Sequence, residues 1–258
     1  MSLLEVRGLT VSYGGVSANI GVDLDVHPGR VTGLIGPNGA GKTTFVDAVT
    51  GFVRPTAGRV QFAGADITSA RPAARARAGL ARTFQSAELF EDLTVRDNLL
   101  VAAQRPRWYS LLSDLVVPSR RRDEGEADAE WALDVLGLGD VAELAPAALS
   151  HGQRKLVGVA RALAMRPSVV LLDEPAAGLD SAESRRLGRQ IRSLLDHGVA
   201  VLLIDHDMEL VMEVCDELYV LDFGAVIAQG PPAAVRTAPA VIAAYLGSTP
   251  APAEVGDE

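Results

Sequence analysis

The sequence predicts an α/β fold with a mainly parallel core sheet flanked by helices. Short continuous apolar runs, such as SVVLLD (168–173) and GVAVLLI (198–204), have the length and β-branched content of buried strands. Segments with helical spacing of apolar residues follow them over 181–196 and 207–215. Because continuous apolar strands alternate with helices, we expect a parallel sheet that is covered on both faces.

The N-terminal third is predicted to consist of short strands, turns and one helix. Partial alternation indicates strands in LEVRGLTVSY (4–13) and VDLDVH (22–27), and GRVQFAG (58–64) follows a proline- and glycine-containing turn. RVTGLIG (30–36) is a β-rich run that ends in glycine. KTTFVDAVTG (42–51) comes next and has the pattern of a helix closed by its final glycine.

The character of the chain changes to helix over residues 88–166. TVRDNLLVAAQ (94–104) and EADAEWALDVLGL (126–138) carry helical spacing, and the mixed segment between them predicts a loop with short helical pieces. Strands and helices then alternate again up to AVIAQG (225–230). The last residues, 248–258, are rich in proline, alanine and acidic residues and are expected to be disordered.

Composition excludes several classes of protein. A chain of 258 residues with a net charge of −9 is poorly suited to nucleic acid, whose phosphate backbone requires a basic face. Cys215 is the single cysteine, so no disulfide forms within the chain, and packing is its expected role. The N-terminus lacks a signal-peptide pattern, and no apolar run is long enough to span a bilayer. The expected location is the cytosol, free or bound to a membrane partner.

A phosphate-binding loop is predicted in GPNGAGKTT (36–44). Its spacing places Gly36, Gly41, Lys42 and Thr43 in the G-x-x-x-x-G-K-[ST] pattern, between a predicted strand and a predicted helix. Glycines allow backbone N–H groups to surround phosphate oxygens, and the helix adds its positive end. In this pattern the lysine binds the β- and γ-phosphates, and the threonine hydroxyl ligates Mg²⁺.

Two adjacent carboxylates end the apolar strand VVLLDEP (169–175). Ionised carboxylates at the end of a buried strand require partners, and ligands bind at the carboxyl ends of strands in such sheets. Asp173 is therefore a candidate to support Mg²⁺ through its water shell. Glu174 is a candidate to polarise the water that attacks the γ-phosphate. The competing interpretation is a solvated junction between strand and loop, which the neighbouring phosphate loop disfavours.

These two motifs and five further elements resemble the ATP-binding cassette (ABC) ATPases, in the family's order and over nearly the whole chain. Tyr13 matches the aromatic residue that stacks on adenine. Gln85, which ends ARTFQ, matches the glutamine that contacts Mg²⁺ and the attacking water. LSHGQ (149–153) resembles the signature segment, normally LSGGQ. Asp180 ends the AGLD loop that crosses to a partner subunit, and His206 in LIDHD matches the switch histidine at the γ-phosphate.

The resemblance implies a P-loop NTPase fold of the ABC type, with an N-terminal antiparallel β subdomain and an inserted helical subdomain. A single ABC ATPase domain is expected over 1–247. Within it, the catalytic core comprises 1–85 and 167–235, the helical signature subdomain comprises 86–166, and 236–247 forms a C-terminal helix.

The resemblance also implies ATP and Mg²⁺ as cofactors. The implied catalytic residues are Glu174, His206, Gln85 and Lys42. Thr43, Gln85 and Asp173 are the implied metal-site residues. The implied nucleotide contacts are Tyr13, Asn38, Gly39, Ala40, Gly41, Lys42, Thr43, Thr44, Ser150, Gly152, Gln153 and Asp180.

The segment LSHGQ predicts a capped helix start. Ser150 would cap the helix, and Gln153, three residues further along, would reach back to the Ser150 backbone. Other N–H groups and the positive helix end then point outward. Since the chain's own phosphate loop already has a helix, this second end is expected to serve the ATP of another subunit through Ser150 and Gly152. His151 is expected to lie beside that phosphate.

Within the family, the chain resembles the ATPase subunits of branched-chain amino-acid importers. The similar segments include ARTFQSAELFEDLTVRDNLLVA, LLDEPAAGLD, DHDMELVMEVCDELYVLDFG and the late IAAYLG. The long segment over 104–130 is typical of that branch, whereas Asp205 departs from its common glutamate. Importers of urea or short amides share most of these features, and lipid-export or non-transport single cassettes remain alternatives. A regulatory module without turnover is a third class, disfavoured by Glu174, Gln85 and His206.

The resemblance implies several partners and a location. These are a second ABC ATPase subunit (identical or a paralogue), transmembrane permease subunits and, indirectly, a solute-binding protein, with no nucleic acid. The expected location is the cytoplasmic face of the cell membrane, held there through the permeases. Leu89, Phe90, Trp108 and Tyr109 are candidate permease contacts, and ordinary packing of the helical subdomain is the alternative for each.

Overall fold

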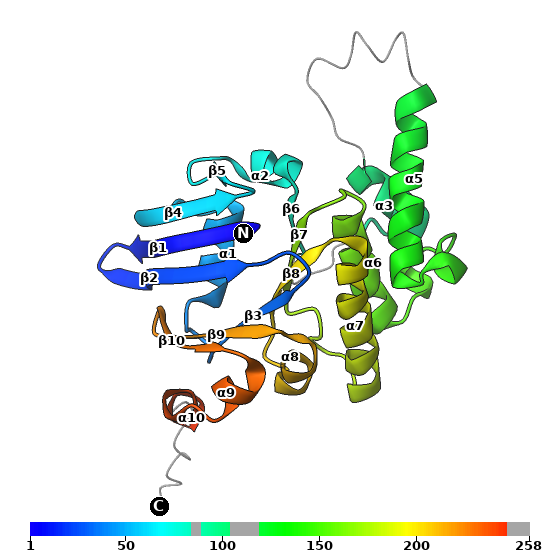
Figure 1. Ribbon diagram of the computed structural model, residues 1–258. Helices are drawn as coiled ribbons and strands as arrows, with labels where there is room; N and C mark the ends of the chain where they lie inside the picture. Colours follow the sequence, from blue (N-terminus) through cyan, green and yellow to red (C-terminus); the bar gives the residue numbers. More distant parts are fainter. Residues whose placement is uncertain (84–88, 104–118, 247–258) are drawn as a thin grey trace, which may run out of the picture.

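The computed structural model describes residues 1–83, 89–103 and 119–246, which form two sheets with helices packed around them (Figure 1). The strands are β1 (Leu4–Tyr13), β2 (Val16–Val26), β3 (Val31–Ile35), β4 (Ala57–Phe62), β5 (Ala65–Asp66), β6 (Leu80–Arg82), β7 (Val169–Asp173), β8 (Ala200–Ile204), β9 (Glu217–Asp222) and β10 (Ala225–Gly230). One four-stranded sheet has the order β2-β1-β4-β5, and one six-stranded sheet has the order β10-β9-β3-β8-β7-β6.

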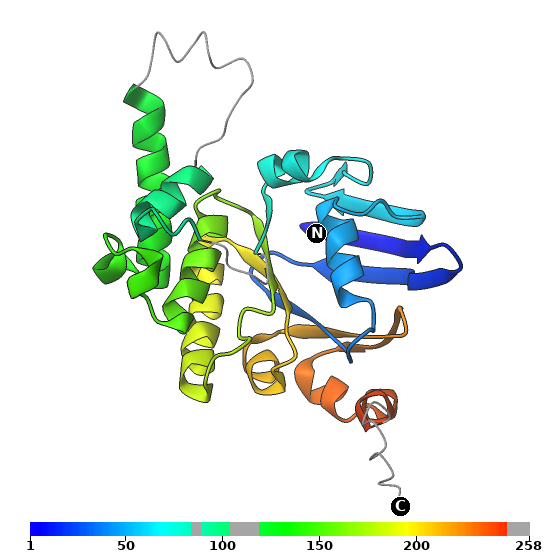
Figure 2. The same cartoon turned by 180° about the vertical axis from the view of Figure 1, so that it is seen from behind.

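The helices occupy both sides of the six-stranded sheet. They are α1 (Lys42–Thr50), α2 (Pro72–Ala78), α3 (Val95–Ala103), α5 (Ser119–Leu136), α6 (His151–Leu163), α7 (Ser181–Ser193), α8 (Met208–Val214), α9 (Pro232–Arg236) and α10 (Pro239–Leu246), with 3₁₀ turns η1 (Gly139–Val141), η2 (Pro146–Ala148) and η3 (Leu194–His197). Both views place α3, α5 and α6 together, at the opposite side of the molecule from the four-stranded sheet (Figures 1 and 2).

The predicted parallel core is confirmed. β6, β7, β8, β3 and β9 run parallel to their neighbours, and β10 at the edge is antiparallel to β9. The smaller sheet is antiparallel throughout its pairs. The strands of the core are fully buried along β3, β7 and β8, which agrees with their continuous apolar sequences.

Alternate residues of the core strands face two separate apolar clusters. In β7, Val170 and Leu172 pack with the helices α3, α5, α6, α7 and α8, whereas Val169 and Leu171 pack with α1 and the antiparallel sheet. This follows from the two-residue period of a strand. The helix α1 therefore lies in the apolar layer between the two sheets, and the loop that precedes it is held at their junction.

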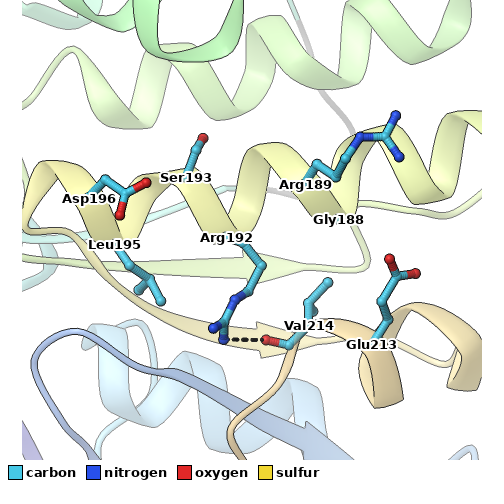
Figure 3. Close-up of a pocket in the computed structure, with 8 residues that line it drawn as sticks. All are labelled: Gly188, Arg189, Arg192, Ser193, Leu195, Asp196, Glu213 and Val214. Carbon is cyan, nitrogen blue, oxygen red and sulfur yellow. Dashed lines mark hydrogen bonds between the residues drawn. The ribbon is translucent and has the colours of Figure 1, made fainter.

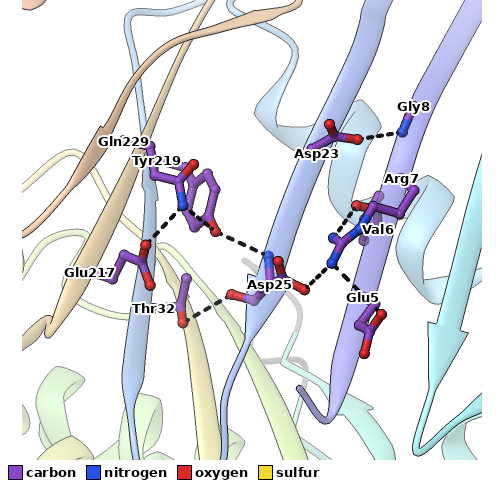
Figure 4. A network of polar contacts seen from close by, with 10 residues as sticks. All are labelled: Glu5, Val6, Arg7, Gly8, Asp23, Asp25, Thr32, Glu217, Tyr219 and Gln229. Atoms are coloured by element: carbon purple, nitrogen blue, oxygen red, sulfur yellow. Dashed lines mark hydrogen bonds and ion pairs between the residues drawn. The ribbon is translucent and has the colours of Figure 1, made fainter. Parts of the chain in front are cut away.

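A polar network joins the two sheets (Figure 4). The phenol oxygen of Tyr219 in β9 accepts hydrogen bonds from the backbone N–H of Asp25 in β2 at 3.2 Å and from the Gln229 amide at 2.9 Å. The Asp25 carboxylate in turn pairs with Arg7 of β1 at 2.8 Å. Because burial raises the pKa of Tyr219, this phenol stays neutral and holds the two sheets through hydrogen bonds alone.

Three helical segments differ from the sequence-based expectation. The helix α5 begins at Ser119, inside the segment expected to be mainly loop; after Pro118 the chain has no further proline there, and its arginine and glutamate residues favour helix. The helix expected over 181–196 changes to 3₁₀ geometry from Leu194. The C-terminal helical region begins at Pro232 and breaks before Pro239.

The predicted disordered tail, 248–258, lies outside the described residues. Within the ranges that the structure describes, no helix has both the length and the apolar character needed to cross a bilayer.

Candidate active site

The phosphate loop leaves β3 and enters α1 with a helix start that carries no side-chain cap. The helix begins at Lys42 after Gly41, whose φ is 101°, and its first turn holds no acidic residue. The N–H groups of this first turn have no intrahelical acceptors. An uncapped helix start of this kind favours an anion such as a phosphate.

Close approach of β2 explains the glycine at position 41. A Cβ on Gly41 would lie 2.2 Å from the Ala18 carbonyl oxygen and 2.8 Å from the Asn19 side-chain nitrogen. Asn19 is fully buried and donates from Nδ2 to the Gly41 carbonyl at 3.1 Å. This contact is not predicted from the sequence, although a polar residue at an inward position of a strand is a detectable signal.

Lys42 turns its ammonium group back over the loop. Its Nζ donates to the carbonyl oxygens of Gly36 at 2.7 Å and Pro37 at 2.9 Å. Burial lowers the pKa of Lys42, while the charges of Glu174 and Asp173 act in the opposite direction. The phosphate-loop lysine and the two predicted carboxylates therefore lie in one electrostatic site.

The two carboxylates differ in burial and backbone geometry. Asp173 ends β7 and is 4% exposed, and burial raises its pKa, which the hydrogen bond and charge of Arg82 oppose. Glu174 is half-buried and has a φ of 48°, in the left-handed region that costs a glutamate energy. Its N–H donates to the Ile204 carbonyl at 2.7 Å, which fixes this turn against β8.

His206 follows β8 and projects from a loop that Asp205 organises. Its side chain is 63% exposed, with Nδ1 at 3.6 Å from the Asp205 carboxylate. Asp205 is 1% exposed and accepts hydrogen bonds from the backbone N–H groups of His206 at 2.7 Å and Asp207 at 3.0 Å. Its other oxygen accepts from the Ala176 N–H at 3.0 Å. The loops of Glu174 and His206 are thus tied together.

The predicted capping box at LSHGQ is confirmed. Ser150 is the N-cap of α6 and its hydroxyl accepts from the Gln153 N–H at 3.2 Å, while the Gln153 side chain accepts from the Ser150 N–H at 2.8 Å. These bonds occupy two groups at the helix start and leave other first-turn N–H groups without intrahelical acceptors.

The residues between them contact the AGLD loop of the same chain. His151 Nε2 lies 3.4 Å from the Ala177 carbonyl, and a Cβ on Gly178 would lie 3.0 Å from that nitrogen. A Cβ on Gly152 would lie 2.9 Å from the Glu183 carboxylate. Asp180 caps α7 by accepting from the N–H groups of Ala182 and Glu183, each at 2.8 Å. The signature segment and the AGLD loop therefore form one packed unit.

Comparison with known proteins identifies the family. A family model described as "ABC transporter" matches residues 20–177. The chain belongs to the ABC transporter family. A second model, described as "Branched-chain amino acid ATP-binding cassette transporter", matches residues 225–250.

Curated relatives and solved structures agree with this assignment. The chain is 43% identical to BraF of Pseudomonas aeruginosa, a high-affinity branched-chain amino acid transport ATP-binding protein, over 95% of this chain and 98% of the relative. It is 40% identical to LivG of Escherichia coli K12, which carries the same description, over the same shares. A nucleotide-free ATP-binding cassette from an ABC transporter matches with a TM-score of 0.83 at 32% identity, covering 95% and 99% of the two chains. An ATP-binding cassette in its ADP conformation matches at 0.84 and 33%, covering 96% and 99%.

The other predicted residues of the cassette differ in exposure. Tyr13 is 54% exposed at the end of β1. Asn38, Gly39 and Thr43 are exposed, Thr44 is half-buried and Ala40 is buried. Gln85 lies outside the described residues, as do Trp108 and Tyr109.

The two remaining candidate permease contacts have neighbours within the helical part of the cassette. Leu89 is buried, and Phe90 is 46% exposed with the Arg161 guanidinium 5.0 Å from its ring centroid.

The donor set of the cassette fits a nucleotide-bound cation. Within residues 1–83, 89–103 and 119–246, no group of three or more His, Cys, Asp or Glu side chains is arranged to hold a metal alone. Mg²⁺ in phosphate-binding sites takes few protein ligands and uses waters and phosphate oxygens for the rest. The Thr43 hydroxyl and the Asp173 carboxylate suit such a shared site.

A cavity of about 400 Å³ lies between α7 and α8 (Figure 3). Gly188, Arg192 and Val214 line it, and Arg192 donates to the Val214 carbonyl at 3.1 Å and pairs with Asp216 at 2.8 Å. None of the predicted nucleotide contacts is among the residues that line this cavity.

Proposed function

We propose that this cassette binds ATP with Mg²⁺ and hydrolyses it to drive the import of branched-chain or other hydrophobic amino acids. The observation that carries the proposal is the electrostatic interaction of Lys42 with Asp173 and Glu174, beside an uncapped helix start. This arrangement combines a phosphate cradle, a metal-site carboxylate and a candidate base in one place.

The first-turn N–H groups of α1 would hold the phosphates of ATP, and Lys42 would exchange its two carbonyl acceptors for the β- and γ-phosphate oxygens. Tyr13, exposed at the end of β1, would stack on the adenine. Thr43, Asp173 and Gln85 would hold Mg²⁺, which when bound neutralises charge on the phosphates.

Hydrolysis requires a water placed in line with the γ-phosphate. Glu174 would accept a proton from this water as the water oxygen bonds to the γ-phosphorus. The bond between the γ-phosphorus and the bridging oxygen breaks, and ADP leaves with that oxygen. His206, exposed beside the same strand ends, would donate a hydrogen bond to the γ-phosphate.

A second cassette would complete the site. The start of α6 at Ser150 offers N–H groups, a hydroxyl and the positive end of a helix that its own chain does not use for phosphate. Two copies, or this chain and a paralogue, would therefore enclose two ATP molecules head to tail. Loss of the γ-phosphate removes the contact that joins them.

The proposed solute and location are supported by the relatives. BraF and LivG are named as branched-chain amino acid transport ATP-binding proteins, and both align with nearly the whole chain. This supports permease subunits as membrane partners, a solute-binding protein as an indirect partner, and a position at the cytoplasmic face of the membrane. Co-purification of two hydrophobic permease chains, followed by uptake assays with leucine and with urea, would separate the amino-acid importer from its alternatives.

The test of the catalytic assignment is Glu174→Gln. We expect this variant to bind ATP with Mg²⁺ normally, to lose turnover and to accumulate as an ATP-bound dimer in size-exclusion chromatography. Lys42→Ala is the matched control, because it should lose ATP binding and therefore also the dimer. A Glu174→Gln variant that binds ATP and stays monomeric at saturating Mg²⁺–ATP would contradict the two-cassette site.

A further inference from the structure

Arg82, the last residue of β6, pairs with two carboxylates from different elements. Its Nη1 donates to Asp47 of α1 at 2.5 Å, and its Nη2 donates to Oδ2 of Asp173 at 2.9 Å. Its side chain is 10% exposed and that of Asp173 is 3% exposed. The guanidinium therefore joins the helix that follows the phosphate loop to the strand that carries the metal-site carboxylate.

The next residue holds the same aspartate through its backbone. The Thr83 hydroxyl accepts from the Asp173 N–H at 3.2 Å, and the Thr83 N–H donates to the Leu171 carbonyl at 2.9 Å. Both the main chain and the carboxylate of Asp173 are thus fixed by residues 82 and 83. In the sequence, Thr83 directly precedes the segment that contains Gln85.

The ion pair with Arg82 uses one carboxylate oxygen of Asp173 and leaves the other for the cation of the nucleotide. Arg82 engages Oδ2, so Oδ1 can face the waters of a bound cation. Lys42 belongs to the same electrostatic site, because the charge of Asp173 opposes the lowering of the Lys42 pKa by burial.

We propose that Arg82 is a positioning residue of the metal site, which directs the Asp173 carboxylate toward Mg²⁺. The inference rests on the proposed Mg²⁺–ATP site. Arg82 itself touches neither ATP nor the ion, and it acts through Asp173. Carboxylates that bind metals depend on such supporting partners for their orientation.

The alternative is that Arg82 is a purely structural cross-link, and the chain supplies a matched example of one. Arg75 of α2 is 2% exposed and donates to the carbonyl oxygens of Ala48 at 2.8 Å and Val49 at 2.6 Å, at the end of the same helix α1. It also donates to the Ala70 and Thr68 carbonyls. Arg75 of α2 is a buried, multiply bonded arginine packed against α1 that has no bond to Asp173 among the contacts of the described chain.

The experiment compares Arg82→Met, Arg82→Lys and Arg75→Met in the full chain. Binding of a fluorescent ATP analogue is titrated with excess Mg²⁺ and again with EDTA. The dissociation constant in EDTA divided by that in Mg²⁺ gives the contribution of the metal to binding. We expect Arg82→Met to lower this ratio about tenfold, as for other residues that support metal ligands. Arg82→Lys keeps the charge but reaches a single carboxylate, so its loss should be about threefold. Arg75→Met should retain the wild-type ratio even where its melting temperature falls.

The outcomes separate the proposal from its alternatives. If Arg82→Met and Arg75→Met have the same ratio of dissociation constants, Arg82 is structural and the proposal is overturned. A higher ratio in Arg82→Met than in the wild-type chain would mean that Arg82 competes with Mg²⁺, which would also overturn the proposal. Should Arg82→Met not fold, the same comparison is decided with Arg82→Lys. If the wild-type chain binds the analogue without any effect of Mg²⁺, the proposed metal site itself is wrong, which is a different failure.

Discussion

The Asp205 carboxylate accepts a hydrogen bond from the Ala176 N–H at 3.0 Å and thereby joins the two loops that carry Glu174 and His206. The same carboxylate accepts from the His206 N–H at 2.7 Å. Asp205 is 1% exposed, so water does not replace these bonds readily. Together with the bond from the Glu174 N–H to the Ile204 carbonyl, this buried side chain sets the relative position of the candidate base and the candidate switch histidine.

Asp205→Ala should lower both stability and turnover. The variant leaves three backbone N–H groups without their acceptor, that of Ala176 buried and those of His206 and Asp207 partly buried, which is expected to cost about 2–3 kcal/mol in the free energy of unfolding. Since the two loops lose their connection, we expect kcat to fall at least about tenfold with little change in ATP affinity. Urea denaturation and a steady-state ATPase assay measure the two effects.

Asp207→Ala is the control for this prediction. Asp207 caps α8 in the same loop by accepting from the Glu209 N–H at 3.0 Å, but it does not reach Ala176. The loss of this cap should cost about 1 kcal/mol and leave kcat nearly unchanged. If the two variants lowered kcat equally, the Asp205 bridge would have no special role in catalysis.

The elements that the sequence predicts well are those whose signals are local. The phosphate loop, the strand before it and the capped start of α6 depend on residues a few positions apart, so glycine spacing and the Ser150–Gln153 pair were sufficient. The core strands were equally clear because burial on both faces makes their sequences continuously apolar.

The contacts that organise the site are not local, and the sequence could not supply them. Arg82 lies 35 residues from Asp47 and 91 residues from Asp173, so only the folded sheet brings the three together. In the sequence, Asp205 differs from the glutamate that is common at this position in the branched-chain importer branch, and this was its only signal. Its backbone partner Ala176 is supplied by the loop after β7. The prediction for Gln85 stays a prediction, since this residue lies outside the described part of the chain.

His151 and Gly152 are expected to differ sharply in their tolerance of substitution. His151 is exposed and its single weak contact to Ala177 is 3.4 Å long, so His151→Gly should change ATPase activity less than about twofold and stability by about 0.5 kcal/mol. Gly152→Asp places a carboxylate at the proposed phosphate contact and beside Glu183. It should stop hydrolysis while ATP binding is retained.

Gly152→Ala separates the two consequences of a side chain at this position. Its Cβ would meet the Glu183 carboxylate at 2.9 Å, which must shift although it accepts the Asp180 N–H in the cap of α7, but the alanine adds no charge. We expect Gly152→Ala to keep part of the activity that Gly152→Asp loses. Equal damage from His151→Gly and Gly152→Asp in a steady-state assay would give the histidine a direct role at the phosphate.

Cys215 should act as a protected thiol that reports unfolding. It is 7% exposed and packs against β3, where a Cβ on Gly33 would lie 2.8 Å from its sulfur. Burial raises the pKa of Cys215 from 9.0 to about 12, with Asp216 acting in the same direction and Arg192 against it. Because the thiolate is the reactive form, labelling by a disulfide reagent at pH 8 should be slow in the folded chain and complete in urea.

The same shift predicts a loss of stability in alkaline solution. The folded state holds the Cys215 proton up to about pH 12, whereas the unfolded chain releases it above about pH 9, so the stabilisation is fully present below pH 9 and is lost as the pH rises toward 12. Each pH unit in this window should remove at most about 1.4 kcal/mol from the free energy of unfolding. Urea denaturation at pH 8 and pH 10 measures this loss, and Cys215→Ala, which cannot titrate, should show a smaller decrease than the wild-type chain. An equal decrease in both proteins, or rapid stoichiometric labelling of the native chain at pH 8, would show that the thiol is accessible and ionises at its ordinary pKa.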